Sequence, residues 1–220
     1  MKKLIAVLVF VICIGTGANA QVKISVLGGP SFTTFGGKKA KDWGGVDKKP
    51  KMAVRFHGGL VVQYPINDKL SAVSGLQYAV KGAVYEGPGF GQQGEFTAEY
   101  KKVLSYIDIP LAIQYAITDK LAIQGGAQVS MLVSAKVKNS KEVQDNFGLP
   151  ASEDVKDSYK GLDMCLSLGP VYNVTEKLLL QLLYQHGLMK IGQYKEFGAD
   201  VTYDIRNQGF KVSLIYVLKN

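Results

Sequence analysis

Six ionisable residues stand at alternate positions of segments that are otherwise apolar, and together they could form ion pairs. They are Arg55, His57, Lys81, Asp108, Asp163 and Lys211. If the segments that carry them close into a barrel, all six side chains point into the lumen, where an unpaired charge costs several kcal/mol. We therefore predict a lumen polar network in which these charges pair with one another. The alternative is that some of them face a water-filled pocket and have no partner.

Acyl transfer is the other chemistry that such residues could support, since it needs a histidine beside a serine or a carboxylate. The chain has two histidines, His57 and His186, and the partners available on strands are Ser105 and Asp108. A lipid-modifying barrel needs this group at the membrane rim, whereas the alternation points His57 inward and places His186 at the outer end of its segment. Metal-ligand spacing and phosphate-binding loops do not stand out. We predict no enzymatic activity and no cofactor, with a lipid-modifying enzyme as an alternative.

Apolar residues recur with a period of two along most of the chain, which is the pattern of β-strands with one apolar face. In one segment Val54, Phe56, Leu60, Val62 and Tyr64 alternate with polar residues. We expect eight such strands, at about residues 22–26, 52–64, 71–84, 106–115, 121–133, 162–172, 180–185 and 210–219. No segment has the spacing of an amphipathic helix.

A heptapeptide that occurs three times predicts how these strands are connected. "YPINDKL" at 64–70 returns as "YAITDKL" at 115–121 and as "YNVTEKL" at 172–178. Each copy joins an even-numbered strand to the next through residues that favour tight hairpins. The other connections are long, at about residues 33–51, 86–101, 139–160 and 188–207. Short turns at one end and long loops at the other indicate an up-and-down antiparallel sheet.

Eight antiparallel strands avoid exposed edges by closing into a barrel. The polar face is rich in Gly, Ala, Ser and Gln, as a narrow lumen requires, and the apolar face carries large side chains suited to hydrocarbon. Tyr64, Tyr115 and Tyr172 share the apolar face and lie beside the short turns. We interpret them as the periplasmic aromatic girdle, because tyrosine favours the headgroup level of a membrane. The alternative is an ordinary all-β protein, such as a soluble lipocalin-like carrier.

The N-terminal residues predict export. Lys2 and Lys3 precede an apolar run that ends before Ala18-Asn19-Ala20, so we read residues 1–20 as a cleaved signal peptide and 21–220 as one barrel domain. Only Cys165 would remain after cleavage, which excludes an internal disulfide.

The formal net charge of +8 has one clear source in the first long loop. Its basic residues are Lys38, Lys39, Lys41, Lys48, Lys49 and Lys51. Lipopolysaccharide phosphates are natural partners for lysines at a cell surface. The alternative is a solvated loop without a specific ligand. We do not expect nucleic acid as a partner, since these lysines lie on a loop of an exported protein.

The stretch "LSYIDIPLAIQY" at 104–115 resembles the aromatic-x-acid-Ile-Pro-Leu strand of the outer-membrane β-barrel family often called porin-like, which includes small barrels of the OmpA and OmpX types. The likeness extends over the whole chain after residue 20. It implies an eight-stranded transmembrane barrel in the outer membrane, with periplasmic short turns and extracellular long loops. It also implies insertion by the barrel-assembly machinery.

Eight strands enclose a lumen that side chains can fill, whereas open channels need about 16 strands or more. We therefore predict a non-enzymatic, monomeric barrel with a side-chain-filled lumen and a role in envelope structure or surface interaction through its long loops. The alternatives are a narrow pore or small-ligand carrier and the lipid-modifying enzyme described above.

Overall fold

The computed structural model describes residues 22–44, 49–91, 94–196 and 199–219. The predicted signal peptide, residues 1–20, lies outside this range. Within it, no helix has the length and apolar character needed to cross a membrane.

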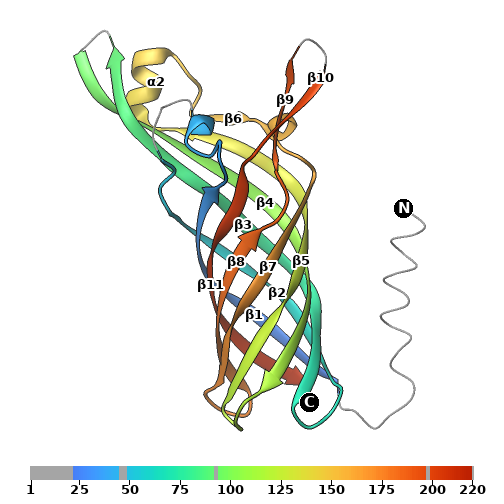
Figure 1. Cartoon of the computed structure of the whole chain (residues 1–220). Helices are drawn as coiled ribbons and strands as arrows, with labels where there is room; N and C mark the ends of the chain where they lie inside the picture. The colour runs from blue at the N-terminus through green and yellow to red at the C-terminus, as the bar shows by residue number, and fades with distance from the viewer. Residues whose placement is uncertain (1–21, 45–48, 92–93, 197–198, 220) are drawn as a thin grey trace.

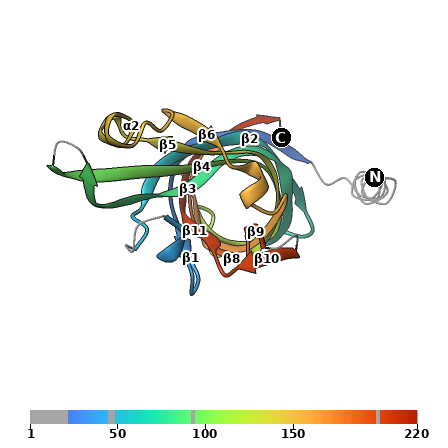
Figure 2. The same ribbon diagram turned by 90° about the horizontal axis from the view of Figure 1, so that it is seen from above.

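Eight antiparallel strands form a closed ring (Figures 1 and 2). In chain order they are β1 (Lys23–Gly36), β2 (Ala53–Pro65), β3 (Leu70–Gly91), β4 (Gly94–Ala116), β5 (Leu121–Asn139), β7 (Leu162–Asn173), β8 (Leu178–Gly187) and β11 (Arg206–Lys219). Each strand pairs with the next of this series, and β1 pairs with β11 to close the ring. The predicted eight-stranded up-and-down barrel is confirmed.

The connections after β2, β4 and β7 are tight turns, and we call this the turn end of the barrel. In each turn an Asn or Thr side-chain oxygen accepts hydrogen bonds from two backbone N–H groups that follow, as Asn67 does from Lys69 and Leu70 at 3.0 and 2.9 Å. Thr118 and Thr175 make the same pair of contacts in the other two turns. The repeated heptapeptide therefore encodes one recurrent local structure.

The opposite end, which we call the loop end, is more ordered than the sequence indicated. It carries η2 (Asp42–Gly44), α2 (Lys141–Phe147), β6 (Ser152–Asp154), η3 (Lys156–Ser158) and the hairpin of β9 (Gly192–Glu196) and β10 (Ala199–Tyr203). The expectation that residues 86–101 form a loop is wrong. β3 and β4 pair continuously up to Gly91 and Gly94, and their hairpin projects well beyond the ring (Figure 1).

Two features explain why the sequence pattern did not indicate the extended β3–β4 hairpin and helix α2. Glycines at 87, 89 and 91 weaken the strand pattern of the hairpin, although Tyr85 pairs with Tyr100 and Glu86 with Glu99. Helix α2 buries only Val143 and ends at Phe147, and the capping residue Gly148 has a left-handed φ of 64°. A seven-residue helix with one buried side chain gives no helical periodicity, so the spacing of apolar residues did not indicate it.

The two faces of the sheet have the predicted character. Outward side chains such as Phe56, Leu166 and Leu214 are 59%, 50% and 49% exposed, whereas inward Asp108 is fully buried. Glycine at inward positions lets neighbouring strands approach closely. A Cβ on Gly126 would lie 2.3 Å from the carbonyl oxygen of Leu111, which a larger residue could not tolerate without moving the backbone.

Candidate functional site

Four of the six predicted lumen residues meet near the middle of the barrel. Lys211 Nζ lies 3.0 Å from Asp108 Oδ2, and Lys81 Nζ lies 3.3 Å from Asp108 Oδ1 and 3.9 Å from Asp163 Oδ2. All four side chains are at most 5% exposed. Two lysines face two aspartates, so the buried charges cancel.

Uncharged side chains add hydrogen bonds to this lumen charge cluster, although Asp163 Oδ1 and Asn207 Oδ1 accept none within the described residues. Lys81 donates to Ser130 Oγ at 2.9 Å and lies 4.6 Å from the centre of the Tyr106 ring. Asn207 donates to Asp163 Oδ2 at 2.9 Å and to the Tyr106 hydroxyl at 3.3 Å. Buried charges need such additional hydrogen bonds to offset their loss of water.

The other two predicted residues lie apart from the carboxylates. His57 is 3% exposed and contacts the hydroxyls of Ser31 and Ser213, both at 2.8 Å. Arg55 donates to the backbone carbonyls of Val54 and Lys102, both at 3.3 Å. The structure therefore places His57 in the lumen among serines and Arg55 against the barrel wall.

Between this cluster and the loop end, the lumen is closed by apolar side chains. We call this group the loop-end plug. Its buried members are Phe35, Ala40, Ala83, Tyr85, Leu104, Tyr106, Leu132, Ala135, Tyr159, Ile191 and Ile205. Tyr85 donates to the carbonyl oxygen of Ala40 at 2.6 Å, which ties the first long connection to the plug. Tyr159 receives a hydrogen bond from Trp43 Nε1 at 2.8 Å, and its burial raises the pKa of its hydroxyl.

The turn half of the lumen differs, because it is a cavity of about 1400 Å³ that opens between the three short turns. The expectation of a lumen filled by side chains is thus wrong for this half. Its lining includes small inward residues such as Ser25, Ser71 and Ala122, and none of the described residues of the long connections reaches it. In the loop-end half, by contrast, Ala40, Tyr159, Ile191 and Ile205 from outside the eight strands help to fill the lumen.

The three predicted girdle tyrosines lie on the outer face at the turn end. Tyr115 and Tyr172 are each 46% exposed, and Tyr64 is half-buried beside Pro65. Their role as membrane anchors remains a prediction. A second aromatic set was missed: Phe56 packs on Tyr78 and Tyr184 on Phe210, with ring centres 5.9 and 5.2 Å apart.

The spacing of the two sets fits a membrane. Phe56 precedes Tyr64 by eight residues on β2. That separation is roughly 26 Å along a strand, or about 20 Å along the axis of a barrel whose strands tilt by ~40°. An apolar band of about 25 Å between aromatic girdles is typical of barrels in outer membranes.

The basic residues of the first long connection are exposed at the loop end, but they are not equivalent. Lys39 pairs with Asp42 at 3.1 Å and Lys51 pairs with Glu86. Lys38, Lys41 and Lys49 are also exposed, and Lys48 lies outside the described residues. Nearby, Arg206 donates to the Asp204 carboxylate at 2.9 Å and thereby lowers the pKa of that group.

Asn207 was not predicted as a site residue, because the sequence pattern placed it in a loop. In the structure, Asn207 pairs with Phe35 at the start of β11. The sequence also indicated Ser105 as a partner for histidine. Ser105 instead accepts a hydrogen bond from Tyr78 at 2.8 Å, away from both histidines. His186 is exposed on β8 and contacts Tyr184. Within the described residues, no group of His, Cys, Asp and Glu could hold a metal ion.

A closed ring of antiparallel strands with an apolar outer band between aromatic residues defines an integral membrane β-barrel. A family model for an outer membrane protein beta-barrel domain matches residues 18–193. The chain belongs to this family, and the protein is located in the cell outer membrane.

Solved structures that match include Ail of Yersinia pestis, with 15% identity, a TM-score of 0.46 and coverage of 91% of this chain and 99% of that one. Neisserial surface protein A matches with 13% identity, a TM-score of 0.47 and coverage of 90% and 97%. Outer membrane protein W of E. coli matches with 14% identity, a TM-score of 0.45 and coverage of 91% and 100%. No curated protein matches the chain.

Proposed function

We propose that this protein is a non-enzymatic barrel whose loop end faces the cell exterior and makes surface contacts, with lipopolysaccharide phosphates as the first partner. The observation that carries the proposal is the contrast between a lumen that is blocked in its loop-end half and a loop end built up from several elements. The β3–β4 hairpin, α2 and the β9–β10 hairpin all stand at that end (Figure 1).

The projecting hairpin offers apolar contact area. Phe90 is 72% exposed near its tip, and Phe147 and Leu149 are 47% and 39% exposed beside it. Phe96 packs against Phe147 with ring centres 5.5 Å apart, so α2 braces the hairpin. Exposed apolar groups that stand clear of the membrane band favour contact with another molecule.

Exposed lysines at the loop end would attract an anionic partner. Lys38 and Lys49 are exposed, and neither has an ion pair within the described residues. Each lysine near an anionic surface contributes about 1 kcal/mol to attraction, which salt weakens.

Titration with lipopolysaccharide tests this partner. The protein in nanodiscs is compared with a Lys38→Gln/Lys49→Gln variant and with a control that loses the same charge at the turn end, Lys69→Gln/Lys120→Gln. We expect the loop-end variant to bind roughly fivefold more weakly per lysine and the control to bind as the unchanged protein does. Equal losses in both variants would contradict the proposal.

Orientation is tested in intact cells with a membrane-impermeant maleimide. Phe90→Cys should be labelled, and Asp119→Cys at the turn end should react only after the outer membrane is permeabilised. Cys165 is buried, so the background is low. Labelling of the Asp119→Cys variant alone would show that the barrel has the opposite orientation.

A narrow pore is the second candidate, because the turn half of the lumen is open. The lumen charge cluster and the loop-end plug both lie across the remaining path, and we expect no single-channel conductance in planar bilayers. For the lipid-modifying alternative, the masses of lipid A species from cells with and without the protein should be the same. His57 contacts two serines inside the lumen, where acyl chains of the surrounding membrane do not reach it.

A further inference from the structure

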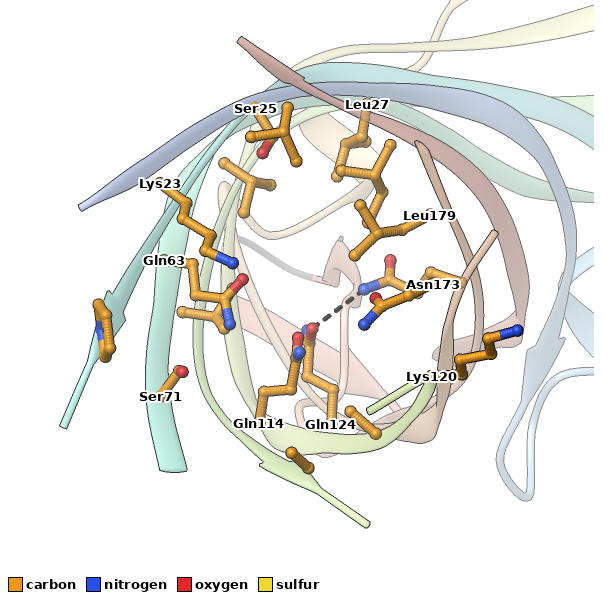
Figure 3. A pocket seen from close by; sticks show the side chains of 18 of the residues that line it. Lys23, Ser25, Leu27, Gln63, Ser71, Gln114, Lys120, Gln124, Asn173 and Leu179 are labelled. Atoms are coloured by element: carbon orange, nitrogen blue, oxygen red, sulfur yellow. Dashed lines mark hydrogen bonds between the residues drawn. The ribbon is translucent and has the colours of Figure 1, made fainter. Parts of the chain in front are cut away.

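We propose that the turn-end cavity is a binding site for a short, extended, N-acylated peptide with aliphatic side chains and a C-terminal carboxylate, taken up from the periplasmic side. This inference does not depend on the loop-end contacts proposed above, and it takes from that proposal only the orientation of the barrel. It rests on the shape of the cavity, on its two unlike walls, and on polar groups that lack partners (Figure 3).

The cavity ends blindly. Its floor is formed by Lys211 and the amides of Gln77 and Gln128, to which Lys211 Nζ donates at 3.5 and 3.4 Å. The same ammonium group is neutralised by Asp108. A ligand that enters from the turn end therefore meets a floor without net charge, which favours a neutral leading group such as an acyl cap.

One wall is aliphatic. Leu27, Val61, Val73, Leu179 and Ile215 line the cavity from β1, β2, β3, β8 and β11, and all of them belong to one apolar cluster. Figure 3 shows Leu27 and Leu179 directed into the opening. Covering this wall with aliphatic side chains of a ligand would remove apolar surface from water.

The facing wall carries amides. Gln114 and Gln124 from β4 and β5 point into the cavity, and Gln181 donates to Gln124 Oε1 at 3.0 Å (Figure 3). Gln124 is 4% exposed, and within the described residues its own amide N–H groups have no acceptor. Gln114 on this wall, and Gln63 beside Lys23 on β2, make no side-chain hydrogen bond to the described part of the chain. Each offers a donor and an acceptor, as a peptide group does.

These two walls select among ligand classes. A hydrocarbon chain would take water from the amides without replacing their hydrogen bonds, which is costly. An oligosaccharide would leave the aliphatic wall poorly covered, and the described lining contains no aromatic ring on which a sugar could stack. An extended peptide presents backbone amides and aliphatic side chains together, so it satisfies both walls.

Lys23 favours one direction of the peptide, although acidic residues of the turns, such as Asp68 and Glu176, also line the mouth. It is exposed at the mouth, and Figure 3 shows its side chain turned toward the opening beside Gln63. It has no ion pair within the described residues. A C-terminal carboxylate that stays at the mouth could pair with this ammonium group while the acylated end lies near the neutral floor.

The test uses the protein in phosphatidylcholine nanodiscs and an N-acetylated pentapeptide of alanine and valine, with binding followed by NMR shifts of glutamine side-chain amides. We expect saturable shifts of Gln63, Gln114 and Gln124. Val73→Trp, which fills the cavity, should weaken binding about tenfold or more, and Ala72→Trp, its outward-facing neighbour, should leave it unchanged. If V73W does not fold, Ala122→Trp on the opposite wall takes its place with the same expectation.

Two further measurements decide the chemical class. Lys23→Gln should weaken binding of the free acid about threefold and leave that of the C-terminally amidated peptide unchanged. Laurate and maltotriose should not give the same shifts at the concentrations at which the peptide does. Absence of saturable shifts, equal binding by V73W, or stronger binding of laurate or maltotriose would each overturn the proposal.

Discussion

The two halves of the lumen are built from the same eight strands and yet have opposite interiors. Toward the loop end, ion pairs, large buried rings and side chains of the long connections occupy the space, whereas the turn end encloses a chamber of about 1400 Å³. Strand number alone therefore does not determine whether a barrel is filled. Side chains that the long connections add to the lumen, such as Tyr159 and Ile191, also decide it.

Removing the central carboxylate should have the largest effect on this contrast. Asp108→Ala leaves Lys81 and Lys211 buried without their shared partner, and we expect the free energy of unfolding to fall by about 3–5 kcal/mol. A urea titration in micelles measures this loss, with the folded fraction followed by heat-modifiable migration on a gel. Asp68→Ala in an exposed turn is the control, and an unchanged midpoint for D108A would mean that the cluster does not stabilise the barrel.

Close strand approach predicts the next effect. A methyl group on Gly126 would lie 2.4 Å from Ala112 Cα, so Gly126→Ala forces the backbone of β4 and β5 apart. We expect a loss of about 2–3 kcal/mol in unfolding free energy. Gly161→Ala meets nothing within 4 Å and serves as the control. Equal stability of both variants would show that the strands yield easily at this point.

Two buried alanines compare the halves directly. Ala135 is 0% exposed within the loop-end plug, and Ala122 is 5% exposed but borders the cavity. Ala135→Leu should cost about 1–2 kcal/mol through overpacking, whereas Ala122→Leu should change stability by less than about 0.5 kcal/mol. The same urea titration applies. A larger loss for A122L than for A135L would mean that the chamber is not open in solution.

The smallest effect is expected for the exposed pair of Lys39 and Asp42, although its 3.1 Å distance is close to that of the buried pair. Lys39→Gln should change the unfolding free energy by less than about 0.5 kcal/mol, because water and salt screen the attraction. A loss comparable to that of D108A would show that distance outweighs burial.

The sequence predicted the ring well because its signals are local. Strand alternation and the repeated turn residues Asn67, Thr118 and Thr175 act within a few positions, and the structure uses each of them in the same way. The inward direction of Lys81 and Asp108 follows from the same alternation. Their contact also depends on how far neighbouring strands are shifted, which no local pattern records.

What could not be predicted depends on packing between distant segments. The cavity is bounded by inward residues of all eight strands, which meet only after closure. Asn207 reaches Asp163 because β11 begins earlier than its alternation indicated, and Ser31 and Ser213 meet His57 from strands far apart in the chain. The β3–β4 hairpin was hidden by its glycines, although cross-strand pairing continues to its tip.

The pairing of β1 with β11 has a consequence for biogenesis. Leu27 lies opposite Ile215, so the contact that seals the ring joins residues from opposite extremes of the described chain. Contacts of such high sequence separation are slow to form, because the intervening polymer must be ordered first. Until β1 and β11 pair, their edges expose backbone N–H and C=O groups without partners, which favours aggregation. A factor that assists insertion would therefore have its largest effect by covering the exposed edges of β1 and β11 until these two strands pair.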